Sequence, residues 1–340
     1  MTAETNVRPG VSIVLPTYNR AGFLHTAFTS LTQQTFRDWE LIVVDDGSTD
    51  DTCAIVARFA ETSGRPVRYI HQENRGPAAA RNAGVAHTRA PYLAFYDSDD
   101  VWLPGYLERS VGALRDNADV DWVFSSCRMV DLNTGAVVAP NTFYVDGSPR
   151  PFLGLHVDRR QRGLNVIVDR RVLAYQLFDG MLCGPQNSVM KRELFERRKY
   201  PEALRIGEDQ LFAISALADR RRLGYFVDPE VIYHVHQGNS SLASASGSTE
   251  RTIDGLRPLV SALADLPAEF PLTAAERRAL NKRLGREYFW HLGYSAYWQN
   301  GRRSEALEMF KRGLEAWPWN AAAWKTYLLA RLKVVVGGAA

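Results

Sequence analysis

The first half of the chain alternates short apolar runs with segments of helical periodicity, and this alternation limits the possible folds more than any other feature. Runs rich in β-branched and aromatic residues lie at 11–15, 39–44, 67–70, 92–96 and 120–124. Between the first two runs, Leu24, Ala27, Phe28 and Leu31 recur at the spacing of one helix face. Strands that alternate with helices form parallel sheets covered by helices. We therefore expect an α/β fold in this part of the chain.

Length and composition predict a folded chain with two domains. The 340 residues are 46% hydrophobic and 23% charged, which is typical of globular proteins. A Ser- and Gly-rich stretch, 238–248, reads as a linker or flexible loop. We place the domains at 1–245 and 246–340. The net charge of +3 is nearly balanced and gives no sign of a nucleic-acid partner.

The predicted location is the cytoplasm. Three widely spaced cysteines suit a reducing compartment, and the first residues contain no apolar signal core. No apolar run approaches the roughly 18 residues that span a bilayer. The closing run 328–336 is expected to be a buried final helix, with peripheral contact at the inner face of a membrane as the alternative.

The region after about residue 250 is wholly helical in its pattern. Trp290 and Trp324 lie 34 residues apart, which is the period of a tetratricopeptide repeat. The large, small, aromatic and terminating positions of that repeat are filled by Tyr297, Ala306, Phe310 and Pro318. The sequence therefore predicts a short TPR-like all-α segment that packs against the first domain, with a generic helical hairpin as the alternative. Such a tail is also a candidate for contact with a partner or a second copy.

The apolar run at 92–96 ends in three carboxylates within four residues, Asp97, Asp99 and Asp100. Clustered carboxylates repel one another unless they are solvated or paired. Mg²⁺ or Mn²⁺ would relieve this repulsion, because hard divalent ions prefer carboxylate oxygens and bridge them to phosphates. Taken alone, an acidic strand end is more often a solvated loop.

Four segments, each at a predicted strand end or helix start, lie at 14–19, 44–50, 74–82 and 97–100. Their sequences are Val-Leu-Pro-Thr-Tyr-Asn, Val-Asp-Asp-Gly-Ser-Thr-Asp, Asn-Arg-Gly-Pro-Ala-Ala-Ala-Arg-Asn and Asp-Ser-Asp-Asp. Ligands bind at the carboxyl ends of strands in open α/β sheets. In this order the segments resemble family 2 glycosyltransferases over about residues 12–242. That resemblance implies the GT-A fold, a Rossmann-like mixed sheet flanked by helices, and an inverting enzyme that uses nucleotide-activated sugars.

The resemblance also implies a donor pocket. Its residues would be Pro16, Thr17, Tyr18, Asp46, Asn74, Gly76, Arg81, Asp97 and Ser98. The Tyr18 ring would form an apolar wall, and Asp46 would bind the base, usually uracil. Arg81 would pair with the diphosphate or with one of the motif carboxylates.

A Mn²⁺ or Mg²⁺ cofactor is implied as well. Asp99 would be its principal ligand, while Asp97 would contact the ribose or the metal. Asp100 is left as an alternative ligand or as a residue that orients the loop. His234 and His236 alternate along a predicted strand and so point to opposite faces. We expect only His236 to reach the site, as a contact to the metal or the pyrophosphate.

The segment 207–212, Gly-Glu-Asp-Gln-Leu-Phe, matches the acidic pair that supplies the catalytic base in this family. We assign that role to Asp209, with Glu208 as the alternative. The predicted reaction moves a sugar from a nucleoside diphosphate sugar, UDP-linked, to a hydroxyl of a glycan, lipid-linked or protein acceptor in polysaccharide biosynthesis. The alternatives are a sugar nucleotidyltransferase, whose glycine-rich loop is missing at 16–20, and a non-catalytic glycan- or nucleotide-binding scaffold.

Overall fold

The computed structural model describes residues 9–181, 183–236, 239 and 249–337. The chain divides into two compact units, Met1–Val172 with Leu182–His236, and Leu173–Met181 with Gln237–Ala340. Apart from residue 239, the predicted linker at 238–248 lies outside the described residues. The domain boundary at residue 245 falls in the same gap and stays a prediction, as does the packing of the tail on the first domain.

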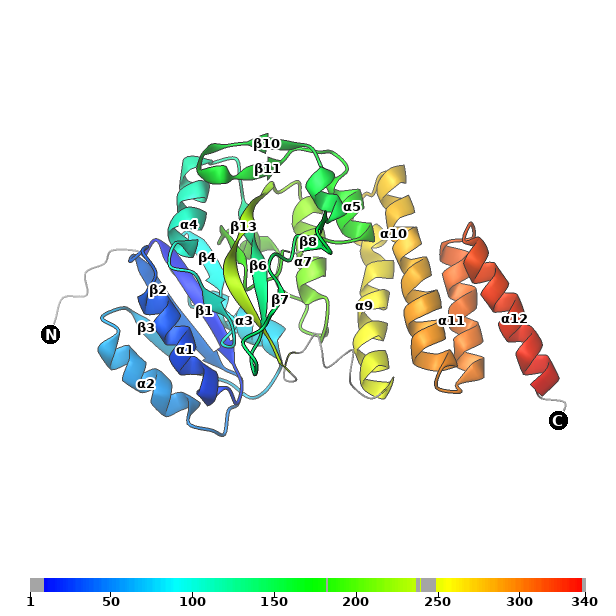
Figure 1. The fold of residues 1–340 in the computed structure, drawn as a ribbon, viewed down its shortest axis with the longest axis horizontal. Coiled ribbons are helices and arrows are strands. Elements are labelled where there is room, and N and C mark those ends of the chain that lie inside the picture. Colours follow the sequence, from blue (N-terminus) through cyan, green and yellow to red (C-terminus); the bar gives the residue numbers. More distant parts are fainter. Residues whose placement is uncertain (1–8, 182, 237–238, 240–248, 338–340) are drawn as a thin grey trace. The chain divides into compact units, whose positions relative to one another are not determined.

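The first unit is built on a mixed sheet whose parallel half carries the predicted strands. These are β1 (Val11–Thr17), β2 (Trp39–Asp45), β3 (Val67–His71) and β4 (Tyr92–Phe95). They lie in the order β3-β2-β1-β4 with every pair parallel. The carboxyl ends of all four strands therefore meet at one edge of the sheet (Figure 1).

The other half of the sheet makes it mixed, as predicted. β12 (Ser188–Lys191) runs antiparallel between β4 and β6 (Trp122–Asp131), and β13 (Leu223–Val235) runs parallel to β6. The remaining strands are β5 (Val101–Trp102), β7 (Val137–Ala139), β10 (Val157–Arg159) and β11 (Asn165–Ile167), with a separate pair, β8 (Tyr144–Val145) and β9 (Ser148–Pro149). These strands have two or three residues each, which is too short to leave a periodic pattern in the sequence.

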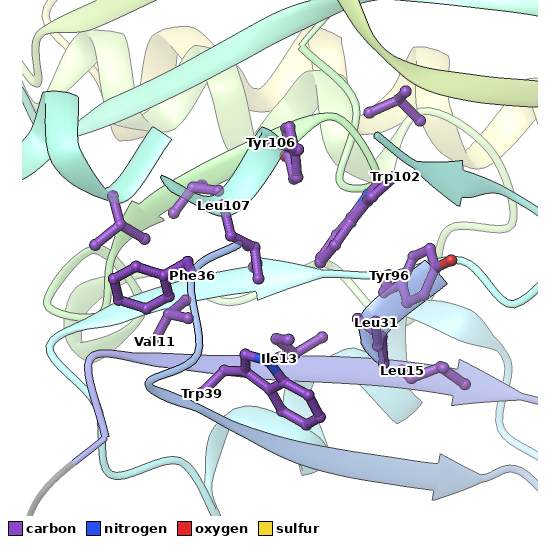
Figure 2. Close-up of a cluster of buried hydrophobic side chains, with 14 of the residues drawn as sticks. Val11, Ile13, Leu15, Leu31, Phe36, Trp39, Tyr96, Trp102, Tyr106 and Leu107 are labelled. Carbon is purple, nitrogen blue, oxygen red and sulfur yellow. The ribbon is translucent and has the colours of Figure 1, made fainter. Parts of the chain in front are cut away.

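Helices cover the sheet on both faces. They are α1 (Ala21–Thr32), α2 (Thr52–Thr62), α3 (Pro77–Val85), α4 (Tyr106–Asp116), α6 (Leu194–Arg197) and α7 (Glu208–Ala218). On one face, alternate residues of β1 point into a fully buried cluster with Leu31 of α1 and Trp39 of β2 (Figure 2). Burying each large apolar side chain of this kind contributes about 1.5–3 kcal/mol.

On the opposite face, α3 approaches the sheet closely at Gly84. A Cβ at this position would overlap the Val14 side chain and lie 3.1 Å from Cγ2 of Val44. Only glycine permits this separation of helix and sheet. The helix that carries Arg81 is thus seated directly on β1 and β2.

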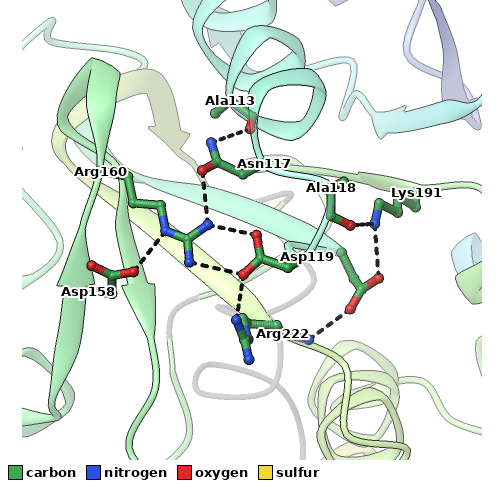
Figure 3. Close-up of polar contacts among 9 residues, drawn as sticks. Ala113, Asn117, Ala118, Asp119, Asp158, Arg160, Lys191 and Arg222 are labelled. Atoms are coloured by element: carbon green, nitrogen blue, oxygen red, sulfur yellow. Dashed lines mark hydrogen bonds and ion pairs between the residues drawn. The ribbon is translucent and has the colours of Figure 1, made fainter.

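A polar network fixes the edge of the sheet near β10 (Figure 3). Arg160 donates to both oxygens of Asp119, at 2.6 and 2.9 Å, and to Oδ1 of Asn117 at 3.0 Å. Arg222, which precedes β13, pairs with the same carboxylate. Hydrogen bonds from Arg160 lower the pKa of Asp119 to about 2. The Asp119 carboxylate therefore holds the turn between α4 and β6 to Arg160, which follows β10, and to Arg222, which precedes β13.

The second unit is helical, as predicted. It contains α9 (Thr249–Glu269), α10 (Ala274–Arg286), a π-helix (Glu287–Trp298), α11 (Arg303–Ala316) and α12 (Ala321–Gly337). Most of α5 (Val172–Phe178) belongs to it too. Arg286 holds this distant segment, because its Nη2 donates to the Phe178 carbonyl at 2.8 Å and its guanidinium lies 5.1 Å from the centre of the Phe178 ring.

The predicted repeat positions Tyr297, Ala306 and Phe310 are fully buried. The final helix differs from expectation. Leu328 and Leu332 of α12 are 56% and 61% exposed, so the prediction of a buried last helix is wrong. Its buried residues are Ala323 and Ala330, and Leu328 and Leu332 lie on the exposed side. Within the described residues, no helix has the length and apolar character needed to cross a membrane.

Candidate active site

The loops after β1 and β2 lie side by side at the carboxyl edge of the sheet. The backbone N–H of Asp46 donates to the Thr17 carbonyl at 2.9 Å. Thr17 is buried, Pro16 is half-buried and the Tyr18 side chain is 48% exposed. Tyr18 is thus placed to present its ring at the rim of this edge.

Asp46 organises the loop that leads into α3. Its Oδ1 accepts from Nε2 of Gln72 at 2.7 Å and from the N–H of Arg75 at 2.9 Å, and its Oδ2 accepts from the N–H of Gly76 at 2.7 Å. Gly76 has a φ of 89°, a conformation in which a Cβ is strained. Asn74 is exposed on the same loop. Asp46 therefore orders the loop before α3 through these three hydrogen bonds. Its contact with a base stays a prediction.

Arg81 joins two of the predicted motifs. Its Nη2 donates to Oδ1 of Asp97 at 2.9 Å, and its Nη1 donates to Oε1 of Glu208 at 3.2 Å. The Arg81 side chain is only 7% exposed. Burial disfavours the charged guanidinium, but the two carboxylates outweigh it and raise the pKa of Arg81. Of the two partners expected for Arg81, the structure shows the carboxylates. Ser98, beside Asp97, is buried.

The two acids at the start of α7 have different partners. Glu208 is held by Arg81, whereas no ion pair reaches Asp209 within the described part of the chain. Oδ1 of Asp209 accepts from the N–H of Gln210 at 2.7 Å. Burial raises the pKa of both carboxyl groups, and the charge of Arg81 opposes that effect in both. Only Glu208 is in direct contact with Arg81, and a carboxylate outside an ion pair is the better proton acceptor, which favours Asp209 over Glu208.

Asp99 lies in a cluster that includes two residues the sequence did not single out, Arg20 and Phe23. Nη1 of Arg20 lies 3.2 Å from Oδ2 of Asp99, and Nε2 of His236 lies 3.0 Å from the same oxygen. The Phe23 ring stacks on His236 with centroids 5.3 Å apart. The position of Arg20 directly after the first motif was the signal that could have identified it.

His234 also contacts the acidic loop, but His236 contacts the Asp99 carboxylate, and the expectation that only His236 reaches the donor site stays a prediction. Nδ1 of His234 lies 2.6 Å from the Asp99 carbonyl, and its N–H donates to Oδ1 of Asp100 at 3.1 Å. Asp100 is 1% exposed. Burial, followed by the charges of Asp97 and Asp99, raises the pKa of Asp100 well above its ordinary value. Of the two uses left open for Asp100, this burial favours orientation of the loop.

Asp99 and His236 are the residues that fit a divalent cation. No group of three or more His, Cys, Asp and Glu side chains converges as a metal site among the residues described. Mg²⁺-type sites commonly take one or two protein ligands and complete their coordination with substrate phosphates and water. Asp99 and His236 suit such a site, because they offer an oxygen and a nitrogen 3.0 Å apart. Asp97 is engaged by Arg81.

Comparison with known proteins identifies the class. Residues 12–197 match the model of glycosyl transferase family 2, which is more than half of the chain. The chain belongs to this family and is a glycosyltransferase. Residues 289–332 match the tetratricopeptide repeat, so the predicted TPR-like extension is confirmed. Membership in this family favours glycosyl transfer over the nucleotidyltransferase and scaffold alternatives.

The chain is 32% identical to the succinoglycan biosynthesis protein ExoO of Rhizobium meliloti over 245 residues, which are 68% of this chain and 63% of that protein. It is 31% identical over 132 residues to WfgD of Escherichia coli, a UDP-Glc:α-D-GlcNAc-diphosphoundecaprenol β-1,3-glucosyltransferase, with coverage of 38% and 51%. The chain thus spans less than two thirds of the curated relatives it matches.

The structure of S. aureus TarS 1–349 in complex with UDP-GlcNAc has the same fold. The TM-score is 0.64 at 20% sequence identity, and the match covers 90% of this chain and 81% of that chain. The predicted GT-A fold is therefore confirmed.

Proposed function

We propose that this enzyme transfers a sugar from a UDP-linked donor to an acceptor hydroxyl, with inversion at the anomeric carbon, in polysaccharide biosynthesis. The observation that carries the proposal is the bridge of Arg81 between Asp97 and Glu208. It joins the acidic end of β4 to the start of α7, where Asp209 lies. The relatives support the donor and the pathway, since WfgD is named for UDP-Glc and ExoO for succinoglycan biosynthesis.

In the proposed reaction, Asp209 accepts the proton of the acceptor hydroxyl while the oxygen attacks the anomeric carbon. The bond from that carbon to the diphosphate oxygen breaks, and the nucleoside diphosphate leaves with the bonding electrons. A single displacement inverts the configuration and requires no nucleophilic side chain. A positioned general base of this kind contributes roughly 10²–10⁴-fold to the rate.

On the donor side, Tyr18 and the loop ordered by Asp46 would border the nucleotide. Asp99 and His236 would hold Mn²⁺ or Mg²⁺, which supplies charge neutralisation at the leaving diphosphate when bound. Arg20 lies beside the same Asp99 oxygen, and its guanidinium can form charge-assisted hydrogen bonds with a phosphate. The proposed acceptor is a glycan or a lipid-linked glycan. We also place the enzyme in the reducing cytoplasm, because its three cysteines are few and widely spaced in the sequence.

Calorimetric titration with UDP, UDP-glucose, UDP-N-acetylglucosamine and GDP-mannose tests the donor, in Mn²⁺ and in chelator. We expect the UDP compounds to bind, more tightly with Mn²⁺. Preference for GDP-mannose would reassign the nucleotide. Absence of binding by all four, in protein shown to be folded by circular dichroism, would contradict the proposed donor site.

A further inference from the structure

The outward side of α12 is apolar. Ala323 and Ala330, seven residues apart, are 2% and 3% exposed and mark the side turned toward α11. Leu328 and Leu332 lie on the opposite side by helical spacing. We define the outer face of α12 by the exposed large side chains on and just before this helix, Trp319, Trp324, Leu328, Leu329 and Leu332, which are 88%, 43%, 56%, 50% and 61% exposed.

This helix packs on α11 through its other side, where Ala323 and Ala330 are buried. Contiguous exposed apolar patches mark sites for another protein or a membrane. The orientation of Trp324 is fixed, since its Nε1–H donates to the Pro318 carbonyl at 2.8 Å. The outer face therefore has the character of a contact surface.

The charged residues of α12 are all positive. Lys325, Arg331 and Lys333 lie on α12, and the sequence has no Asp or Glu from residue 316 to 340. Within the described residues, no carboxylate pairs with these three side chains. On α11, by contrast, Arg312 pairs with Glu308 at 3.0 Å and Lys311 with Glu315 at 3.8 Å. The positive charge of α12 is thus left for an external anion.

We propose that the outer face of α12 binds the surface of an anionic lipid bilayer. The tryptophans and leucines enter the headgroup region, as in helices that lie in the plane of a membrane interface. The long stems of Lys325, Arg331 and Lys333 extend their charges to the lipid phosphates. A second copy is a poorer occupant, because a symmetric pairing of this face brings three cations against three with no carboxylate between them. The proposal needs no catalysis and so stands apart from the proposed function.

Co-sedimentation of the full chain with vesicles tests the proposal. Vesicles of phosphatidylcholine alone are compared with vesicles that also contain phosphatidylglycerol, at low and high salt. We expect binding to the anionic vesicles that weakens with salt, because salt screens the attraction of Lys and Arg to an anionic surface. The double variant Leu328→Glu/Leu332→Glu should lower the partition coefficient at least about tenfold.

Val138→Glu is the matched control, since Val138 is a 57% exposed apolar residue on β7. It should bind vesicles like the wild type. Lys325→Glu/Lys333→Glu should weaken binding to the anionic vesicles only, and circular dichroism should show that every variant is folded. Unchanged partition of the double leucine variant, or equal binding to both vesicle types, would overturn the proposal. A dimer in light scattering that this variant abolishes, without vesicle binding, would assign the face to a second copy.

Discussion

At the start of α7, two adjacent carboxylates differ in their electrostatic surroundings. Arg81 neutralises Glu208, while Asp209 is buried without an ion pair among the described residues. In the proposed reaction, replacing Asp209 removes the proton acceptor, whereas replacing Glu208 removes one of the two carboxylates that hold Arg81.

We predict that Asp209→Asn lowers kcat by roughly 10²–10⁴-fold, because the amide cannot accept the hydroxyl proton. Affinity for the donor, measured by calorimetry, should stay nearly unchanged. Glu208→Gln is the matched control and should weaken donor binding by releasing Arg81. Turnover of the Asp209→Asn enzyme at the wild-type rate would remove Asp209 from the role of base.

The pH dependence should report the same carboxyl group. Burial raises the pKa of Asp209 above its ordinary value of 3.8, so the group becomes protonated while the pH is still above that value. Since the base acts as the carboxylate, kcat/KM should rise with pH through an acid limb whose midpoint lies above pH 3.8. The residual kcat/KM of the Asp209→Asn variant should lack this acid limb. If the acid limb persists in that variant, another titrating group is responsible for it.

We predict that Asp99→Asn abolishes the effect of Mn²⁺ on UDP binding, because the shared oxygen between Arg20 and His236 loses its charge. Arg20→Gln should instead retain the Mn²⁺ effect and bind UDP more weakly. Calorimetry with and without chelator separates the two outcomes. Equal Mn²⁺ dependence in wild type and Asp99→Asn would exclude Asp99 as a ligand.

At the scale of the elements, the loop between β3 and α3 depends on a backbone conformation. Gly76→Ala places a Cβ at a φ of 89° and a ψ of 168°, a conformation essentially restricted to glycine, which costs about 1–3 kcal/mol even though no atom beyond the adjacent residues lies within 4 Å of that Cβ. Gly22→Ala in α1 is the control, because it also meets nothing within 4 Å and has an ordinary φ, so it should be neutral or stabilising. Urea unfolding measures the free energy of unfolding of both variants. Equal values for the two variants would contradict backbone strain at residue 76.

The elements that the sequence predicted are those with a periodic signal. The runs at β1, β2 and β3 are long and β-branched, and the fold follows from their alternation with helices. The two residues of β5 carry no period, so β5 could not be found. The motif acids were found, but the bridge of Arg81 to both Asp97 and Glu208 depends on residues 127 positions apart in the chain. The exposure of α12 was misjudged because apolar composition does not say which side is covered.

At the scale of the whole molecule, the helical unit includes a piece of chain from far upstream. Residues 173–181 contribute the buried Leu177 to it, and Arg286 holds Phe178. A chain ending at residue 248 should therefore aggregate, because 173–181 would lose the helices of its own unit. Solubility and thermal unfolding of the truncated chain check this, and a soluble, active truncation would contradict it.

A finer variant tests the same connection without truncation. Arg286→Ala removes a charged donor from the Phe178 carbonyl and should cost about 1.5–3 kcal/mol. Arg278→Ala, on the exposed side of α10, should change the unfolding free energy by less than about 0.5 kcal/mol.

The close approach of α3 to the sheet at Gly84 also affects the position of Arg81. Arg81 lies on the same helix three residues earlier, so the gap between helix and sheet sets how far its guanidinium extends toward Asp97. A single methyl group at residue 84 would lift the helix and lengthen that reach, although the residue has no polar atom and touches no substrate. A side chain at residue 84 can therefore disturb the contact of Arg81 with Asp97 without removing any polar group from the site.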